Sequence, residues 1–242
     1  LWWNVALGYP GLTNAEILNY DLRYEWFFKN NELLSIGYFY KDFTKPIEIA
    51  LISTPDLVYK TFLNAESAIS RGFELEFRKL IPIIPISKGV VNFSMNGTFS
   101  TSKVNEQDSI MLYNGTTYPN SSISNTGSRS LVGHSKILIN TSIDVQLSSG
   151  YSASLSYNSY SRRLNTFAVG SLGNEYEFPY HSLNLTTSKN INNLKLSLKV
   201  KNILKSKLKF GLIDESNDDQ ILYTSIYDPG YSVSFSLSYK IR

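Results

Sequence analysis

Tyr-Ser-Val-Ser-Phe-Ser-Leu-Ser-Tyr-Lys-Ile, residues 231–241, alternates large apolar side chains with serine or lysine without a break. Because successive side chains of a strand point to opposite faces, this stretch predicts a strand with one apolar and one polar face. Eight further segments alternate in a similar way: Tyr20–Phe28, Leu34–Lys41, Gly72–Arg78, Val91–Phe99, Ile137–Leu147, Tyr151–Tyr157, Leu183–Thr187 and Leu194–Val200. We therefore predict nine strands and an all-β fold without helices.

The connections between these strands alternate in length. Short connections are expected at Asn30-Asn31, at the Pro-rich stretch Leu80–Gly89, at Ser148–Gly150 and at Asn190–Asn193. Long connections are expected at Thr44–Tyr59, Val104–His134, Arg163–Glu177 and Ser206–Gly230. Short turns on the periplasmic side and long loops outside are typical of an outer-membrane barrel. This interpretation places the C-terminus in the periplasm.

Alternation alone is compatible with two architectures, an antiparallel transmembrane β-barrel and a soluble β-sandwich. The aromatic content, with 17 Tyr, 13 Phe and 3 Trp, favours the barrel, since many of these residues lie near strand ends. Tyr231 and Tyr239 would lie about 26 Å apart along a strand, which a tilt of about 40° reduces to about 20 Å. That separation is close to the ~25 Å apolar band of such barrels.

Composition restricts the other classes of protein. The chain has 242 residues, no Cys and a net charge of +3, which exclude a disulfide scaffold and give no indication of nucleic-acid binding. No apolar run approaches the ~20 residues of a transmembrane helix, so a membrane role must use strands. The chain starts at Leu1, and nine strands is an odd number for a bacterial barrel, so we expect a part of a longer protein.

The sequence offers no catalytic or metal site and no cofactor motif. The two histidines, His134 and His181, have no nearby carboxylate cluster with metal-ligand spacing. The acidic residues of the last long connection, Asp214, Glu215, Asp218 and Asp219, lack the spacing of an EF-hand and are expected to be a solvated loop. Neither Gly-x-Ser-x-Gly nor a glycine-rich phosphate loop is present. We therefore expect a protein that is not an enzyme.

Five segments carry a family resemblance: Gly8–Leu12 with Asn19–Glu25, Asn64–Ala68 with Gly72–Lys79, Arg129–Ser135 with Asn140, Lys201–Leu204, and Pro229–Tyr231 with Ser234–Lys240. In this order they resemble motifs in the barrel of TonB-dependent outer-membrane receptors. The resemblance implies that residues 1–242 are the C-terminal part of a 22-stranded barrel, without the plug and the N-terminal strands. It implies outer-membrane lipid, the protein's own plug, the remaining barrel strands, the TonB system and a surface lipoprotein as partners.

Such a barrel needs a wet lumen. The alternation turns nine charged residues toward it: Asp21, Arg23, Glu25, Glu74, Glu76, Arg78, Lys195, Lys199 and Lys201. Most of these charges are expected to form a solvated wall, and direct contact with a solute is the less favoured interpretation. Ligand contacts are expected instead in the long connections, at Tyr113, Tyr118, Arg162, Arg163 and Phe167, since long loops with aromatic groups are often functional.

Two function classes remain open from the sequence. One is TonB-energised uptake of a large, scarce nutrient such as a siderophore, haem, cobalamin, a glycan or a peptide. The other is a non-transporting β-sheet protein, either a surface adhesin or a soluble binding module. Extraction distinguishes a barrel from a sandwich, because only the barrel requires detergent.

Overall fold

The structure is a computed structural model that describes residues 5–53, 58–83, 88–105, 109–111, 117–119, 129–169, 173–214 and 220–241. Strands and the turns between them dominate these residues. None of the described residues belongs to a helix that is long and apolar enough to cross a membrane. The strands form two large sheets and one small hairpin.

The larger sheet, here the main sheet, has nine strands in the spatial order β18-β15-β14-β11-β10-β7-β6-β3-β2. Its strands are β2 (Glu16–Lys29), β3 (Glu32–Thr44), β6 (Ser67–Ile83), β7 (Gly89–Asn105), β10 (Ile137–Leu147), β11 (Tyr151–Tyr160), β14 (Tyr180–Ile191), β15 (Leu194–Lys201) and β18 (Ser232–Tyr239). Each contains or overlaps one predicted strand, and all their pairings are antiparallel. The nine predicted strands are therefore confirmed, in an up-and-down order.

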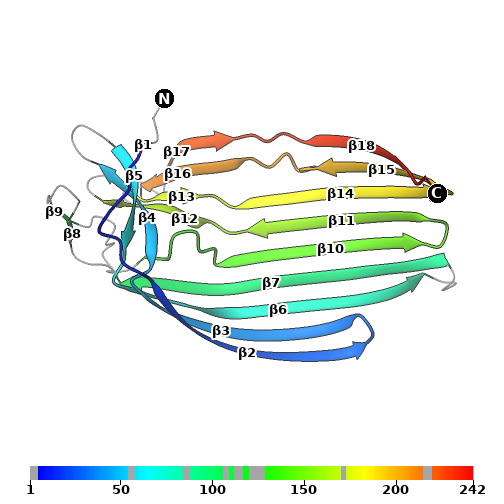
Figure 1. The fold of residues 1–242 in the computed structure, drawn as a ribbon, viewed down its shortest axis with the longest axis horizontal. Coiled ribbons are helices and arrows are strands. Elements are labelled where there is room, and N and C mark those ends of the chain that lie inside the picture. The colour runs from blue at the N-terminus through cyan, green and yellow to red at the C-terminus, as the bar shows by residue number, and fades with distance from the viewer. Residues whose placement is uncertain are drawn as a thin grey trace.

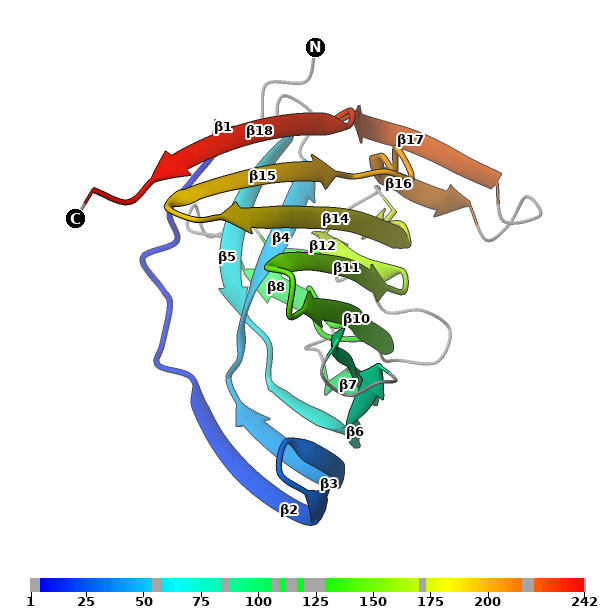
Figure 2. The same cartoon turned by 90° about the vertical axis from the view of Figure 1, so that its right-hand side faces the viewer.

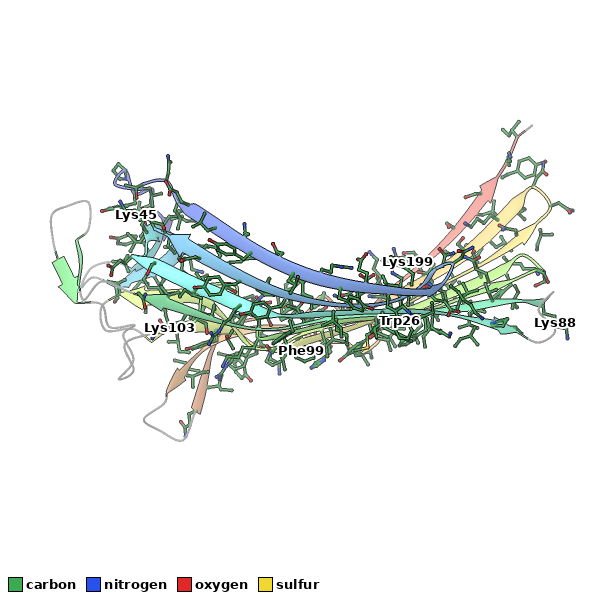
Figure 3. The ribbon with its side chains drawn as sticks, turned by 90° about the horizontal axis from the view of Figure 1, so that it is seen from below. Trp26, Lys45, Lys88, Phe99, Lys103 and Lys199 are labelled. Atoms are coloured by element: carbon green, nitrogen blue, oxygen red, sulfur yellow. The ribbon has the colours of Figure 1, made fainter. Side chains whose placement is uncertain are left out.

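The main sheet curves into a trough with a different chemistry on each side (Figure 2). Phe99 lies on the convex side and Lys199 on the concave side (Figure 3). In register with Phe99 are Phe73 and, one strand further, Tyr38, and these three rings are 46%, 58% and 38% exposed. A soluble sheet buries such a face against a second layer, but nothing in the described part of the chain covers this one. The convex face therefore has the character of a lipid-facing surface.

The short turns lie together at one end of the main sheet (Figure 1). Asn31, Gly150 and Asn192 adopt the left-handed conformation there, with φ of 65°, 79° and 51°. Glycine and asparagine tolerate this conformation best, which explains their presence in the tight hairpins. The last strand, β18, runs toward this same end (Figure 1).

The prediction of nine strands was incomplete, because the segments outside the main sheet contain strands as well. A seven-stranded sheet, here the loop sheet, comprises β1 (Val5–Ala6), β5 (Val58–Asn64), β4 (Ile47–Ser53), β12 (Arg163–Val169), β13 (Glu175–Glu177), β16 (Leu208–Asp214) and β17 (Gln220–Tyr227). A separate hairpin pairs β8 (Ser109–Met111) with β9 (Thr117–Pro119). These elements gather at the end opposite the short turns (Figure 1).

Two pairings of the loop sheet are parallel, β1 with β5 and β4 with β12. The second places Ala50 opposite Phe167, so strands from two distant connections become neighbours. Ala50 and Ile52 of β4 pack with Leu63 of β5 and with Leu164, Phe167 and Val169 of β12 in a buried cluster. Burying a side chain as large as Phe167 contributes about 1.5–3 kcal/mol. The apolar core of the chain thus lies among the long connections, while the main sheet exposes its apolar face.

Candidate functional site

Four charged side chains form one ion-pair network on the concave face of the main sheet. Arg23 of β2 donates through Nε to Oε1 of Glu25 at 2.7 Å and through Nη2 to Oε2 of Glu76 on β6 at 2.7 Å. Glu76 also pairs with Arg78. The intervening strand β3 presents Gly37 opposite Arg23, so the long side chains meet across it without obstruction. Exposed pairs of this kind stabilise a fold by only about 0–1 kcal/mol, and the network is better suited to a hydrated wall.

The other five charged residues of the predicted wall also follow the polar alternation: Asp21, Glu74, Lys195, Lys199 and Lys201. Lys199 lies opposite Thr186 and Ser234 and therefore shares their polar face. No described carboxylate forms an ion pair with the three lysines of β15. The concave face therefore has a mixed-charge bank on β2 and β6 and a basic strip on β15.

Between these banks, uncharged polar groups join one another across β7, β10 and β11. Asn158 donates to Oδ1 of Asn140 at 2.7 Å, and Asn140 donates to Oδ1 of Asn96 at 2.8 Å. The hydroxyls of Ser94 and Ser142 lie 2.8 Å apart. The alternation of the sequence indicated this face, but the asparagine ladder had no signal of its own, since it depends on the register of three strands.

The predicted ligand-contact residues lie in different environments. Tyr113 lies outside the described residues, and of Tyr118 only the strand position in β9 is described. Arg162 is exposed, with its guanidinium 5.1 Å from the ring of Tyr176. Arg163 donates to Oε2 of Glu177 at 2.8 Å, and Phe167 is only 3% exposed within the core of the loop sheet. Of the described candidates, Arg162 is therefore the most exposed, and Arg163, whose side chain is 31% exposed, is partly engaged by Glu177.

A polar cluster that sequence reasoning did not find joins four strands of the loop sheet. Glu175 of β13 accepts hydrogen bonds from Asn165 of β12 at 2.7 Å and from Thr224 of β17 at 2.6 Å. The ammonium group of Lys60 on β5 lies 3.7 Å from the same carboxylate. These residues are far apart in sequence, and only the pairing of the strands brings them together.

A buried ion pair fixes the loop sheet to the last part of the long connection Val104–His134. Glu48 of β4 accepts a hydrogen bond from Nη2 of Arg129 at 2.8 Å and another from the backbone N–H of Val132 at 2.6 Å. The two side chains are 4% and 5% exposed, and the guanidinium lies 4.0 Å from the ring centre of Phe167. The sequence signal was a single glutamate inside the apolar run Ile47–Ile52. The only sequence signal at Arg129 was its place in the family-like motif Arg129–Ser135.

The two histidines lie apart and form ordinary hydrogen bonds. Nε2 of His134 lies 2.9 Å from the hydroxyl of Ser100. Burial lowers the pKa of His134, and the nearby charge of Lys136 lowers it further. Nδ1 of His181 lies 2.7 Å from the hydroxyl of Tyr157. Within the described ranges no group of three or more acidic or histidine side chains could hold a metal ion. Glu215, Asp218 and Asp219 of the acidic patch lie outside those ranges, as does the side chain of Asp214.

Comparison with known proteins gives one family and several similar folds. Residues 4–239 match the outer membrane protein beta-barrel family. The outer membrane transporter YddB from Escherichia coli is similar with a TM-score of 0.60 at 15% identity, over 100% of this chain and 35% of that one. The FrpB iron transporter from Neisseria meningitidis has a TM-score of 0.58 at 11% identity, over 98% and 33%. The ferric enterobactin receptor PfeA from Pseudomonas aeruginosa, as the Q482A mutant in complex with enterobactin, has a TM-score of 0.55 at 17% identity, over 94% of this chain and 32% of that one.

These similarities extend to the fold, and the chain spans about a third of the length of the solved structures, namely 35%, 33% and 32%. No curated protein matches the sequence. The predicted transmembrane barrel fold is confirmed, and the alternative of a soluble β-sandwich is excluded by the family match together with the uncovered convex face.

Proposed function

Because the chain belongs to the outer membrane protein β-barrel family and lies in the bacterial outer membrane, we propose that it forms the C-terminal part of the barrel of an energised nutrient transporter. The substrate class is a large, scarce solute such as a siderophore, haem, cobalamin, a glycan or a peptide. Strands outside this sequence complete the barrel, and a plug fills it.

The observation that carries this proposal is the open, curved main sheet. Its convex face is apolar and its concave face is polar, and β2 and β18 form its two edges. In a membrane every backbone hydrogen-bonding group must be paired, so these edge strands require partner strands. Since the diameter of a barrel grows with its strand number, a barrel of which this sheet is only a part has room for a plug.

The concave face supports a wet passage rather than a sealed core. The nine charged residues predicted for the lumen follow the alternation of that face, and the basic strip Lys195, Lys199 and Lys201 offers contacts to an acidic plug surface or an anionic solute. The TonB system would act on the plug, and a surface lipoprotein would act at the outer end, where the loop sheet and Arg162 lie. Siderophores are the first ligands to test, because two similar structures are a ferric enterobactin receptor and an iron transporter.

Uptake in cells tests the proposal. Cells with and without the full-length protein are supplied with labelled ferric siderophores, haem, cobalamin, oligosaccharides and peptides, each with the TonB system intact or inactivated. We expect uptake of one class, lost when the TonB system is inactivated. Uptake that persists without TonB would show a passive pore. Binding without uptake of any class would favour the adhesin alternative, and both results would contradict energised transport.

A further inference from the structure

A cluster of lysines lies on the outside of the trough, where the strands of the main sheet end near the loop sheet. A hollow of about 480 Å³ is lined, among other residues, by Phe178, His181, Lys205, Lys207, Lys209 and Tyr223. The segment between β15 and β16 supplies two of the lysines, and β16 supplies Lys209. Basic and aromatic groups thus share one concavity.

The hollow lies on the convex side of the sheet. The ammonium group of Lys205 lies 5.1 Å from the ring of Tyr231, and Tyr231 shares its alternation with the exposed apolar residues Val233 and Phe235. The ring of His181 stacks on Tyr157 at 6.1 Å, and Tyr157 is in register with Leu183. A solute in the concave passage would be on the opposite side of the sheet.

Along the strands, the hollow lies at the border of the apolar band of the convex face. β15 and β18 pair from Leu194↔Tyr239 to Lys201↔Ser232, a length of about 23 Å along the strand at about 3.3 Å per residue, which a tilt of about 40° reduces to about 18 Å across the membrane. The lysine segment begins directly beyond this length. It lies at the end away from the short turns, which is the outer end of an outer-membrane barrel. At this level a convex side chain meets the headgroups of the outer leaflet.

The charge of the cluster is only partly compensated. Lys207 pairs with Asp228 at 2.9 Å. Neither Lys205 nor Lys209 forms a close ion pair with a described carboxylate, although the charge of Lys205 also acts on Asp228. Their ammonium groups lie over the rings of Tyr231 and Tyr223, at 5.1 and 5.7 Å. Lysine side chains at such a border place their stems along apolar surface and direct the ammonium group to the headgroups.

The same combination recurs elsewhere on the convex face. A second hollow, of about 490 Å³, is lined by Arg71, Lys136 and the rings of Tyr38, Phe73 and Phe99, among other groups. Arg71 precedes Phe73 by two residues on β6 and therefore points to the same face. Two separate hollows thus combine basic side chains with the aromatic groups of the convex face.

We propose that the hollow at Lys205 and Lys209 binds the phosphate groups of an outer-leaflet glycolipid, whose acyl chains lie on the apolar convex face. Ammonium groups bind phosphate as point charges, and basic pockets on membrane proteins recognise anionic headgroups in this way. Aromatic side chains at the membrane–water interface anchor the protein at the same depth in the membrane. This proposal rests on the outer-membrane location and not on the transported ligand.

Lipid titration of the full-length protein in detergent tests the proposal, with native mass spectrometry as the readout. The probes are a glucosamine-based lipid with two phosphate groups (lipid A), the same lipid with its phosphates removed, and inorganic phosphate. The variant K205Q/K209Q leaves the Lys207–Asp228 pair intact. K205R/K209R preserves the charge, and K88Q removes one charge at the short-turn end, where Figure 3 places Lys88.

The phosphorylated lipid should bind about thirtyfold more weakly to K205Q/K209Q, at about fivefold for each lysine near a membrane surface. K205R/K209R and K88Q should bind like the wild type. Removing the phosphates should weaken binding to the wild type and to these two controls, but not to K205Q/K209Q. Three results would overturn the proposal: equal binding of the two lipids to the wild type, equal binding of the phosphorylated lipid to the wild type and to K205Q/K209Q, or displacement of the lipid by inorganic phosphate. If K205Q/K209Q does not fold, the comparison of the two lipids and phosphate on the wild type decides.

Discussion

Replacing Glu48 by alanine should release the loop sheet while the main sheet stays folded. Glu48 is the acceptor for both the guanidinium of Arg129 and the backbone N–H of Val132, and its side chain is 4% exposed. The substitution removes the carboxylate that faces the Arg129 guanidinium, while the guanidinium stays buried beside Phe167. Removing one partner of a buried ion pair costs about 3–5 kcal/mol, mostly from the charge left behind.

The loss should be confined to β4 and β12, which form the core next to the ion pair. Since about 1.4 kcal/mol corresponds to a factor of ten, amide protection in these strands should fall about a hundredfold to a few thousandfold. Hydrogen exchange of the full-length protein in detergent, read by mass spectrometry on peptides covering Ile47–Ser53 and Leu164–Val169, measures this directly. Peptides from β10 and β11 should not change.

Two controls separate charge burial from packing. The double variant E48M/R129M replaces both charges by apolar groups and should recover most of the protection, because a buried pair is often replaceable as a unit. E25Q breaks an exposed pair with Arg23, whose side chain is 46% exposed. This variant should change the amide protection of β4 and β12 by about fivefold at most. If E48A alters the protection of β4 and β12 no more than E25Q does, the buried pair does not hold the loop sheet and the reasoning fails.

Three further predictions concern orientation, faces and pH. In this cysteine-free chain, S149C in a short periplasmic turn should resist a membrane-impermeant maleimide added to whole cells. G173C should react, since a Cβ at Gly173 meets open space. Labelling of S149C from outside would contradict this orientation. F93K on the convex face should cost about 2–4 kcal/mol if it lies near the bilayer midplane, and the neighbouring S94K almost nothing, as measured by urea unfolding in lipid; equal penalties would contradict a lipid-facing convex side. Because the pKa of His134 is lowered from 6.5, its contribution to stability should be complete above pH 6.5 and should decline as the pH falls below that value. Amide protection of residues 129–136, corrected for the intrinsic pH dependence of hydrogen exchange, should show this decline in the wild type and not in H134N. An unchanged pH profile in H134N would contradict the prediction.

The main sheet was predictable because each strand has one apolar and one polar face. Two-residue alternation is the direct consequence of that arrangement, and it is clearest in Tyr231–Ile241. The short hairpins carry asparagine or glycine, where the backbone needs a left-handed residue. Register between strands was not predictable, so the asparagine ladder at Asn140 emerged only from the structure.

The loop sheet was missed for a physical reason. β4 reads Ile-Glu-Ile-Ala-Leu-Ile-Ser, with apolar groups on both faces, because Ala50 and Ile52 are buried on one side while Ile47 and Ile49 lie on the other. Such a strand loses the alternating signal. Aromatic content suggested ligand contact at Phe167, whereas its environment in the structure is a core that depends on the parallel pairing of β4 with β12.

The parallel pairing of β4 with β12 also has a consequence for the order of folding. β4 lies between β3 and β6, whereas β12 lies between β11 and β14, so the two strands meet only after the intervening hairpins have docked. Forming such a non-local contact early would require the closure of a long, unstructured loop, which is slow. The loop sheet should therefore be among the last parts to form. Burial of the Glu48–Arg129 pair would then indicate that the strands of the main sheet have already assembled in the correct order.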